Sequence, residues 1–188
     1  MFSDSPTRLS LGQVRTGVNY AILLSSTAGL WAYDIGDTVE FLSLSPYRIR
    51  VTGRIKHFIS AFGEHVIGNE VEAALREVTG RLGGEVTEFT VAPQVSPPEG
   101  LPYHEWLVEF STPPADPDRF AAALDAAMVR LNVYYQDLIE GKILRPLVLT
   151  ELPRGAFRDY MKREGKLGGQ NKVPRLSNDR KIADSLRS

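Results

Sequence analysis

The chain has 188 residues, of which 43% are hydrophobic and 24% are charged, and its formal net charge is −1. These fractions are those of an ordinary folded protein and exclude a disordered or collagen-like chain. The near-neutral charge argues against a general nucleic-acid binder, and the absence of cysteine excludes disulfides, zinc–thiolate sites and cysteine nucleophiles.

The first third of the chain reads as β-strands. Residues 20–25 form a continuous apolar run of strand length, and residues 38–42 and 48–52 alternate in side-chain type. Turn-forming residues separate these strands, as at 35–37 and 45–46. An all-strand segment of this size buries too little surface to fold alone.

The middle of the chain predicts helices and strands in alternation. Asn69 is a favourable N-cap with Glu72 three residues on, and apolar residues then recur at helical spacing up to Leu82. A second helix begins at Asp116 and runs to Leu138. Strands are predicted at 85–92, 103–110 and 147–149, and a third helix at 156–163.

The order of these elements defines a fold class. From residue 67 it is helix, strand, strand, helix, strand, which fits a small antiparallel or mixed sheet with two helices on one face. We therefore expect an α+β protein. Residues 1–52 form the strand segment, and residues 53–188 form a complete α+β domain, joined at 52–56.

The sequence also bears on the compartment. No apolar run approaches the roughly 18 residues needed to cross a bilayer, and the first ten residues lack the basic and apolar regions of a secretory signal. Without cysteine or an export signal, we expect a cytoplasmic protein with no membrane partner.

Charge is distributed unevenly along the chain. Residues 67–150 hold 6 basic and 13 acidic side chains, whereas residues 151–188 hold 10 basic and 5 acidic ones. A basic tail of this kind is usually a solvated surface, but it also suits contact with an anionic ligand. It surrounds a glycine- and lysine-rich loop at 165–172, which reads either as a mobile surface loop or as a segment that closes over phosphate.

Two charged residues near strand ends have two interpretations each. Asp37 follows Ile35-Gly36 and is either a turn residue or a carboxylate that accepts both hydroxyls of a ribose. Arg54 follows Gly53 and is either a surface arginine or a donor to sugar or phosphate.

Other catalytic motifs are missing from the sequence. The three histidines have no metal-binding spacing, so we expect no metal site built by the chain itself. There is no G-x-S-x-G nucleophile elbow and no G-x-x-x-x-G-K-[ST] phosphate loop.

Three stretches of sequence together resemble one known family. They are residues 28–37 (AGLWAYDIGD), residues 53–72 with GRIKHFI, FGE and EVE, and residues 166–178 (KLGGQNKVPRLSN). In this order they resemble the C-terminal part of the auxin-responsive-promoter family of acyl-acid amido synthetases, in its bacterial branch. That family belongs to the adenylate-forming superfamily, with acyl-CoA synthetases, adenylation domains and luciferases.

The resemblance implies roles for individual residues. Asp37 ends a Tyr-x-x-Gly-Asp signature and is implied to hold the ribose hydroxyls of ATP. Arg54 belongs to the Gly-Arg that begins the hinge and is implied to lie near the ribose. Lys56 matches the hinge position itself. Lys172 resembles the mobile lysine that meets the α-phosphate during adenylation.

The resemblance also implies the reaction and its participants. Members activate a carboxylic acid with ATP and Mg²⁺ and then pass the acyl group to an amine, such as an amino acid. Residues 1–52 are implied to be the C-terminal end of a large adenylating domain. Residues 53–188 are implied to be a small, mobile, ferredoxin-like domain with its hinge at 53–56.

Family members carry several hundred residues ahead of this region, including a phosphate loop, an acyl pocket and most adenine contacts. The resemblance therefore implies that ATP with Mg²⁺ is bound mainly by that missing N-terminal domain. We therefore expect the chain to be a fragment of an acyl-adenylating ligase, to have the large N-terminal domain as its partner, and to be inactive alone. The alternative is a non-catalytic ferredoxin-like module that serves binding or regulation.

Overall fold

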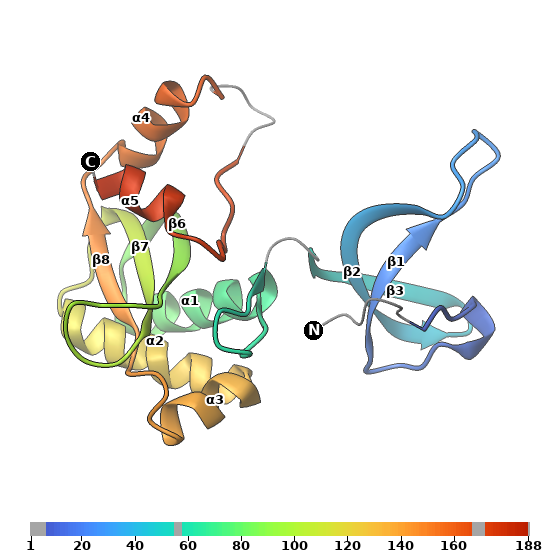
Figure 1. Cartoon of the computed structure of the whole chain (residues 1–188), viewed down its shortest axis with the longest axis horizontal. Coiled ribbons are helices and arrows are strands. Elements are labelled where there is room, and N and C mark those ends of the chain that lie inside the picture. Colours follow the sequence, from blue (N-terminus) through green and yellow to red (C-terminus); the bar gives the residue numbers. More distant parts are fainter. Residues whose placement is uncertain (1–6, 55–57, 167–171, 188) are drawn as a thin grey trace.

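The computed structural model of the chain is an α+β fold (Figure 1). It describes residues 7–54, 58–166 and 172–187. A three-stranded sheet near the N-terminus precedes a larger body of helices and strands (Figure 1). The elements are the 3-10 helix η1 (Leu11–Gln13), β1 (Asn19–Leu24), β2 (Tyr33–Leu44), β3 (Tyr47–Arg54), β4 (Phe58–Ile59), β5 (Val66–Ile67), α1 (Gly68–Leu82), β6 (Glu85–Gln94), β7 (Tyr103–Thr112), α2 (Pro117–Leu131), α3 (Val133–Glu140), β8 (Val148–Leu152), α4 (Ala156–Arg163) and α5 (Lys181–Arg187).

The first sheet has the antiparallel order β1-β2-β3. All three strands were predicted, but β2 is much longer than expected and begins at Tyr33. The predicted turn at 35–37 is therefore wrong. Gly36 has a positive φ of 77° inside the strand, and pairing with both neighbours holds this stretch extended. Asp37 is consequently a strand residue.

This sheet leaves much of its apolar surface in contact with solvent. Val39 and Phe41 are buried, but Tyr47, Ile49 and Val51, which alternate along β3 and so share one face, are 49%, 47% and 61% exposed. Exposed apolar residues grouped on one face are typical of a surface that binds other protein surface. The three strands thus contribute little buried core of their own.

The second three-stranded sheet has the order β6-β7-β8, with β6 and β7 antiparallel and β7 and β8 parallel. The order helix, strand, strand, helix, strand was predicted, and of the two sheet types left open, antiparallel or mixed, the structure has the mixed one. Helices α1 and α2 pack on one face, as expected. Their shared core includes the side chains Val71, Leu75, Val78, Trp106, Val108, Phe120, Leu124 and Met128.

The opposite face of this sheet is covered as well. Helices α4 and α5 pack there around a second core that includes Ala92, Leu107, Leu152, Phe157, Val173 and Leu186. The sequence predicted α4 with its observed bounds but not α5. Strand β7, the middle strand, is therefore buried on both faces. Its Glu105 accepts hydrogen bonds from Thr150 (2.6 Å) and Arg180 (2.7 Å) on this side.

Two helix ends differ from the sequence prediction. The second helix does not run to Leu138, because Asn132 adopts extended backbone angles and its side chain accepts from the Tyr135 amide at 2.8 Å. Asn132 thereby ends α2 and caps α3. The first helix begins before Asn69, at Gly68, and Glu70 rather than Glu72 accepts the Ile67 amide at 3.0 Å.

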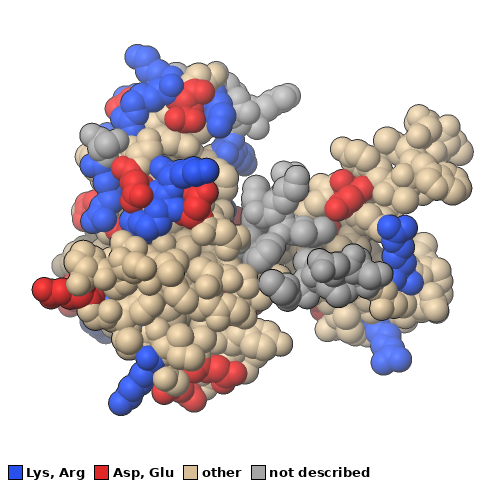
Figure 2. Space-filling view, in the orientation of Figure 1, with Lys and Arg blue, Asp and Glu red and all other residues tan. Residues whose placement is uncertain are grey.

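Half of the ten basic residues of the tail lie on α4 and α5, and the others precede α4 or lie between the two helices in the chain. Figure 2 shows lysines and arginines interspersed with acidic residues over these helices. Several of them form ion pairs, such as Arg180 with Asp184 at 3.1 Å. This pattern favours the interpretation of the tail as a solvated surface. Among the helices of the described ranges, none combines the length and apolarity that a membrane crossing requires.

Candidate functional site

A cleft of about 340 Å³ lies where the first sheet meets the start of α1. Its volume falls within the range of small-molecule sites. Both parts of the chain contribute to its walls, since β2 and β3 supply one side and α1 and the segment after Lys172 supply the other. The lining residues are Asp37, Val51, Thr52, Gly53, Gly68, Asn69, Glu72 and Arg175.

The structure brings Asp37 and Arg54 together in register. They are directly paired across the antiparallel strands β2 and β3, and Gly53 is paired with Thr38 beside them. Directly opposed residues on antiparallel strands have Cα atoms about 5 Å apart. Asp37 is half-buried and lines the cleft. Two residues that the sequence singled out for nucleotide binding thus occupy one short stretch of the sheet.

A small polar cluster fixes the strands behind this pair. The hydroxyl oxygens of Thr38 and Thr52 lie 3.0 Å apart, and the Thr52 hydroxyl donates to Asn19 Oδ1 at 2.5 Å. Thr38 and Thr52 are both buried. Because the three residues come from three different strands, their hydrogen bonds hold this wall of the cleft in one arrangement.

The start of α1 is held by two carboxylates, the half-buried Glu70 and the buried Glu64. Glu70 accepts the Ile67 amide and, at 2.9 Å, the side-chain amide of Asn132. Burial raises the pKa of Glu70, although both hydrogen bonds oppose the rise. The β4–β5 hairpin just before α1 is tied to β7, where Glu64 Oε1 lies 2.8 Å from His104 Nε2 and both side chains are buried. These contacts set the position of Gly68 and Asn69 in the cleft.

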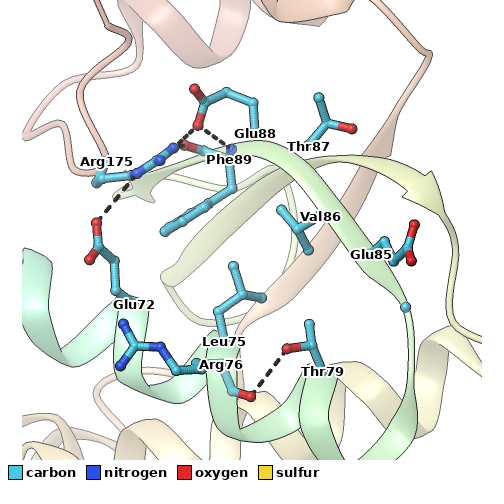
Figure 3. A pocket seen from close by; sticks show the side chains of 11 residues that line it. Glu72, Leu75, Arg76, Thr79, Glu85, Val86, Thr87, Glu88, Phe89 and Arg175 are labelled. Carbon is cyan, nitrogen blue, oxygen red and sulfur yellow. Dashed lines mark hydrogen bonds and ion pairs between the residues drawn. The ribbon is translucent and has the colours of Figure 1, made fainter.

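Arg175 provides the cation that lines the cleft. Its Nε lies 3.6 Å from Glu72 Oε1, and its guanidinium also pairs with Glu88. The same group lies 4.6 Å above the ring of Phe89. Arg175 and Glu72 also line a neighbouring pocket of about 470 Å³ between α1 and β6 (Figure 3). Arg175 therefore stands at the boundary between the two hollows.

The structure does not place Lys172 in the cleft. Lys172 is exposed and lies three residues before Arg175. Three residues of extended chain span at most about 11 Å. The lysine predicted to meet the α-phosphate is thus tethered close to the cleft that contains Asp37. The fourth predicted residue, Lys56, lies outside the described residues.

The sequence interpretation did not predict Glu72 and Arg175 as site residues. Glu72 was used to mark the start of a helix and as part of the EVE stretch, and Arg175 was noted only as part of a motif. The signal available was the proximity of Arg175 to Lys172 in the chain. Within the described ranges, no three His, Cys, Asp or Glu side chains are grouped so as to hold a metal ion. The cleft itself has two carboxylates, Asp37 and Glu72, which suit contacts to ribose hydroxyls and to the cation of a metal–nucleotide substrate.

Comparison with known proteins identifies the family. Residues 2–54 match the GH3 family central domain, and residues 68–181 match the GH3 family C-terminal domain. The chain therefore belongs to the GH3 family. This confirms the resemblance to acyl-acid amido synthetases that the three sequence stretches indicated. The boundary near residue 52 and the hinge at 53–56 stay predictions.

Two curated relatives come from Arabidopsis thaliana. Indole-3-acetic acid-amido synthetase GH3.3 is 26% identical over 192 residues, and GH3.10, of the same description, is 26% identical over 194 residues. The matches cover 96% and 97% of this chain but 32% of each relative. The chain thus spans about a third of the length of these relatives.

A solved structure shares the fold. The GH3.15 acyl acid amido synthetase superposes with a TM-score of 0.77 at 18% identity, over 95% of this chain and 34% of that one. A second structure of this synthetase, in complex with 2,4-DB, gives a TM-score of 0.72. These matches confirm the predicted α+β fold class.

Proposed function

We propose that the chain supplies the ribose-binding and cation-delivering part of an ATP-dependent acyl acid amido synthetase. The observation that carries this proposal is the cleft between the two parts of the chain. Asp37 and Gly53, from two family signature stretches, line it together with Arg175 from the third. Residues more than a hundred positions apart thereby meet at one small-molecule-sized hollow.

The proposed reaction has two steps. A carboxylate oxygen of the acid attacks the α-phosphorus of ATP, the bond from that phosphorus to the oxygen bridging to the β-phosphorus breaks, and pyrophosphate leaves. The nitrogen of an amine, such as an amino acid, then attacks the acyl carbonyl. AMP leaves with the electron pair of the broken bond, and the amine loses a proton as the amide forms.

Each residue has a role set by charge. The Asp37 carboxylate accepts hydrogen bonds from the ribose hydroxyls, and Arg54, its cross-strand neighbour, lies near the same sugar. Lys172 brings a positive charge to the α-phosphate as the two anions approach, which offsets their repulsion and stabilises the developing charge. Lys56, at the predicted hinge, permits the rotation that delivers Lys172. Mg²⁺ enters with ATP and neutralises its phosphates.

The partners and location follow from the same proposal. The substrates are Mg·ATP, a carboxylic acid and an amine. The face of the first sheet that carries Tyr47, Ile49 and Val51 is the surface for the remaining part of the synthetase. The protein works in the cytoplasm, where ATP is abundant.

Asp37→Asn tests the ribose contact in a complete synthetase, in which this chain is joined to the remaining two-thirds of a curated relative. We expect the variant to weaken Mg·ATP binding about tenfold or more, because a neutral amide accepts more weakly from two hydroxyls than a carboxylate does. Calorimetric titration with Mg·ATP measures the affinity.

Glu40→Gln is the matched control for this titration. Glu40 lies on the same strand, pairs with Arg50 at 2.6 Å and does not line the cleft. Its affinity for Mg·ATP should equal that of the unsubstituted chain. Equal affinities for Asp37→Asn and the unsubstituted chain would remove Asp37 from the proposed site.

A further inference from the structure

The residues after Lys172 are bound closely to strand β6. The Val91 amide donates to the Arg175 carbonyl at 2.9 Å, and the Ser177 amide donates back to the Val91 carbonyl at 2.9 Å. The Thr90 hydroxyl donates to the Pro174 carbonyl at 2.7 Å. The 172–177 segment is therefore joined to β6 by a parallel bridge between Leu176 and Val91.

The segment also passes from one core of the domain to the other. Val173 is 5% exposed and packs in the core beneath α4 and α5, whereas Leu176 is 2% exposed and packs in the core beneath α1 and α2. Backbone hydrogen bonds and two buried side chains thus fix the segment at the open edge of the sheet. Lys172 is its first residue and is exposed.

Arg175 binds this segment to two different elements. Figure 3 shows its guanidinium between Glu88 on β6 and Glu72 on α1, above the face of Phe89. It also donates to the Phe89 carbonyl at 3.3 Å. A planar guanidinium that pairs with two carboxylates and stacks on a ring is held in orientation as well as in place.

We propose that Arg175 is a positioning residue, which locks the 172–177 segment to β6 and α1 and so fixes the point from which Lys172 reaches the nucleotide cleft. This inference deepens the proposed function and rests on it for the role of Lys172. Arg175 and Glu72 line the cleft with Asp37. The residue that anchors the lysine segment and the carboxylate proposed to bind the ribose therefore line the same cleft.

Hydrogen exchange on the 188-residue chain tests the anchor without any assay of activity. In Arg175→Met we expect the Val91 and Ser177 amides to exchange about tenfold faster or more, because the charged contacts that hold the segment closed are lost. The Val108 amide, in the middle of the sheet, should keep its rate. Equal acceleration at Val108 would mean general destabilisation and would overturn the proposal.

Arg76→Met is the matched control. Arg76 lines the same neighbouring pocket, but its side chain comes from α1, and Figure 3 draws no interaction between it and Arg175. This variant removes the same charge and should leave the exchange of Val91 and Ser177 unchanged. If both variants accelerate these amides equally, pocket charge rather than the Arg175 anchor controls the segment, and the proposal is wrong.

Two further variants keep the test decisive if Arg175→Met folds poorly. Glu88→Gln removes one carboxylate partner, and Arg175→Lys retains the charge but not the planar fork. In both variants the Ser177 amide should exchange faster than in the unsubstituted chain but more slowly than in Arg175→Met. If Arg175→Met cannot be measured, both variants should still exchange several-fold faster than the unsubstituted chain at Ser177. Unchanged rates in both would refute the anchor.

A nitroxide label at position 172 reports on the lysine position itself. Because the chain has no cysteine, Lys172→Cys gives a single labelling site. The label should become more mobile when Arg175→Met is added and should not when Arg76→Met is added. If the anchor is confirmed while Lys172 proves dispensable for adenylation, the proposed function fails and the anchor stands. If the label is unaffected by Arg175→Met, the anchor fails independently of the reaction.

Discussion

Replacing Lys172 with methionine is expected to lower adenylation about 10²- to 10³-fold, the loss typical when one preorganised group that stabilises transition-state charge is removed. Methionine keeps the length of the side chain but not its charge. The assay is ATP–pyrophosphate exchange in a complete amido synthetase, in which this chain is joined to the remaining two-thirds of a curated relative. The starting chimera must show measurable exchange.

Lys181→Met is the control for this experiment. Lys181 is exposed, as Lys172 is, but lies on α5, outside the 165–172 loop and the family stretch. Its loss should change the exchange rate less than twofold, because exposed charges away from a site contribute little. Lys172→Arg should recover part of the rate, since it restores charge with a different geometry. An unchanged rate in Lys172→Met would favour the alternative, a non-catalytic binding or regulatory module.

Removing His104 is expected to destabilise the C-terminal body by about 3–5 kcal/mol, the range for breaking a buried ion pair. His104→Leu leaves the Glu64 carboxylate buried and without its imidazole partner. The exposed fraction is 2% for the His104 side chain and 0% for that of Glu64. The hairpin that carries Glu64 leads directly into the cleft at Gly68. Denaturant unfolding of the chain measures the loss.

The double variant His104→Leu/Glu64→Met separates the pair from the packing around it. Because it removes the stranded carboxylate, it should recover at least about half of the lost stability. Glu40→Gln, which breaks the exposed pair with Arg50, should cost less than about 1 kcal/mol. A double variant less stable than His104→Leu would show that the pair does not explain the effect.

The same pair predicts a pH dependence. Burial alone raises the pKa of Glu64, but the hydrogen bond and charge of His104, with backbone amides, hold it below its ordinary value of 4.5. A carboxylate whose pKa is lower in the folded state stabilises the fold above its unfolded pKa. That contribution is lost as pH falls below 4.5 through the folded value. His104→Leu should therefore lose less additional stability than the unsubstituted chain between about pH 5 and pH 3.

The sequence predicted the elements whose periodicity is strong and local. Helix α4 and the helix–strand–strand–helix–strand order were correct because apolar spacing, caps and turn residues agreed with one another. The break at Asn132 was missed because the apolar stripe of α2 continues into α3, and only the side-chain cap on Tyr135 distinguishes two helices from one. Helix α5 was missed because its seven residues make too short a pattern.

The candidate site was predictable in part. Asp37 and Arg54 were predicted from signature motifs, and the long pairing of β2 with β3 brings them into register, while their roles stay predictions. Glu72 and Arg175 were not predicted as site residues because their proximity depends on the 172–177 segment lying along β6 beside α1. That is a tertiary contact, which local patterns do not encode. The burial of two carboxylates outside the cleft, Glu105 and Glu109 of β7, was not predicted for the same reason. Their hydrogen-bond partners lie on β8 and around α4 and α5.

Asp37 and Lys172 serve the same nucleotide in the proposed synthetase. Paramagnetic relaxation by Mn·ATP bound to the complete chimera measures this shared proximity, because the effect falls steeply with distance from the metal at the phosphates. We expect the amides of Gly53 and Lys172 to relax faster together, and both effects to disappear in Asp37→Asn. Relaxation at Gly53 with none at Lys172, or an effect at Lys172 that survives Asp37→Asn, would show that the two residues do not share a nucleotide.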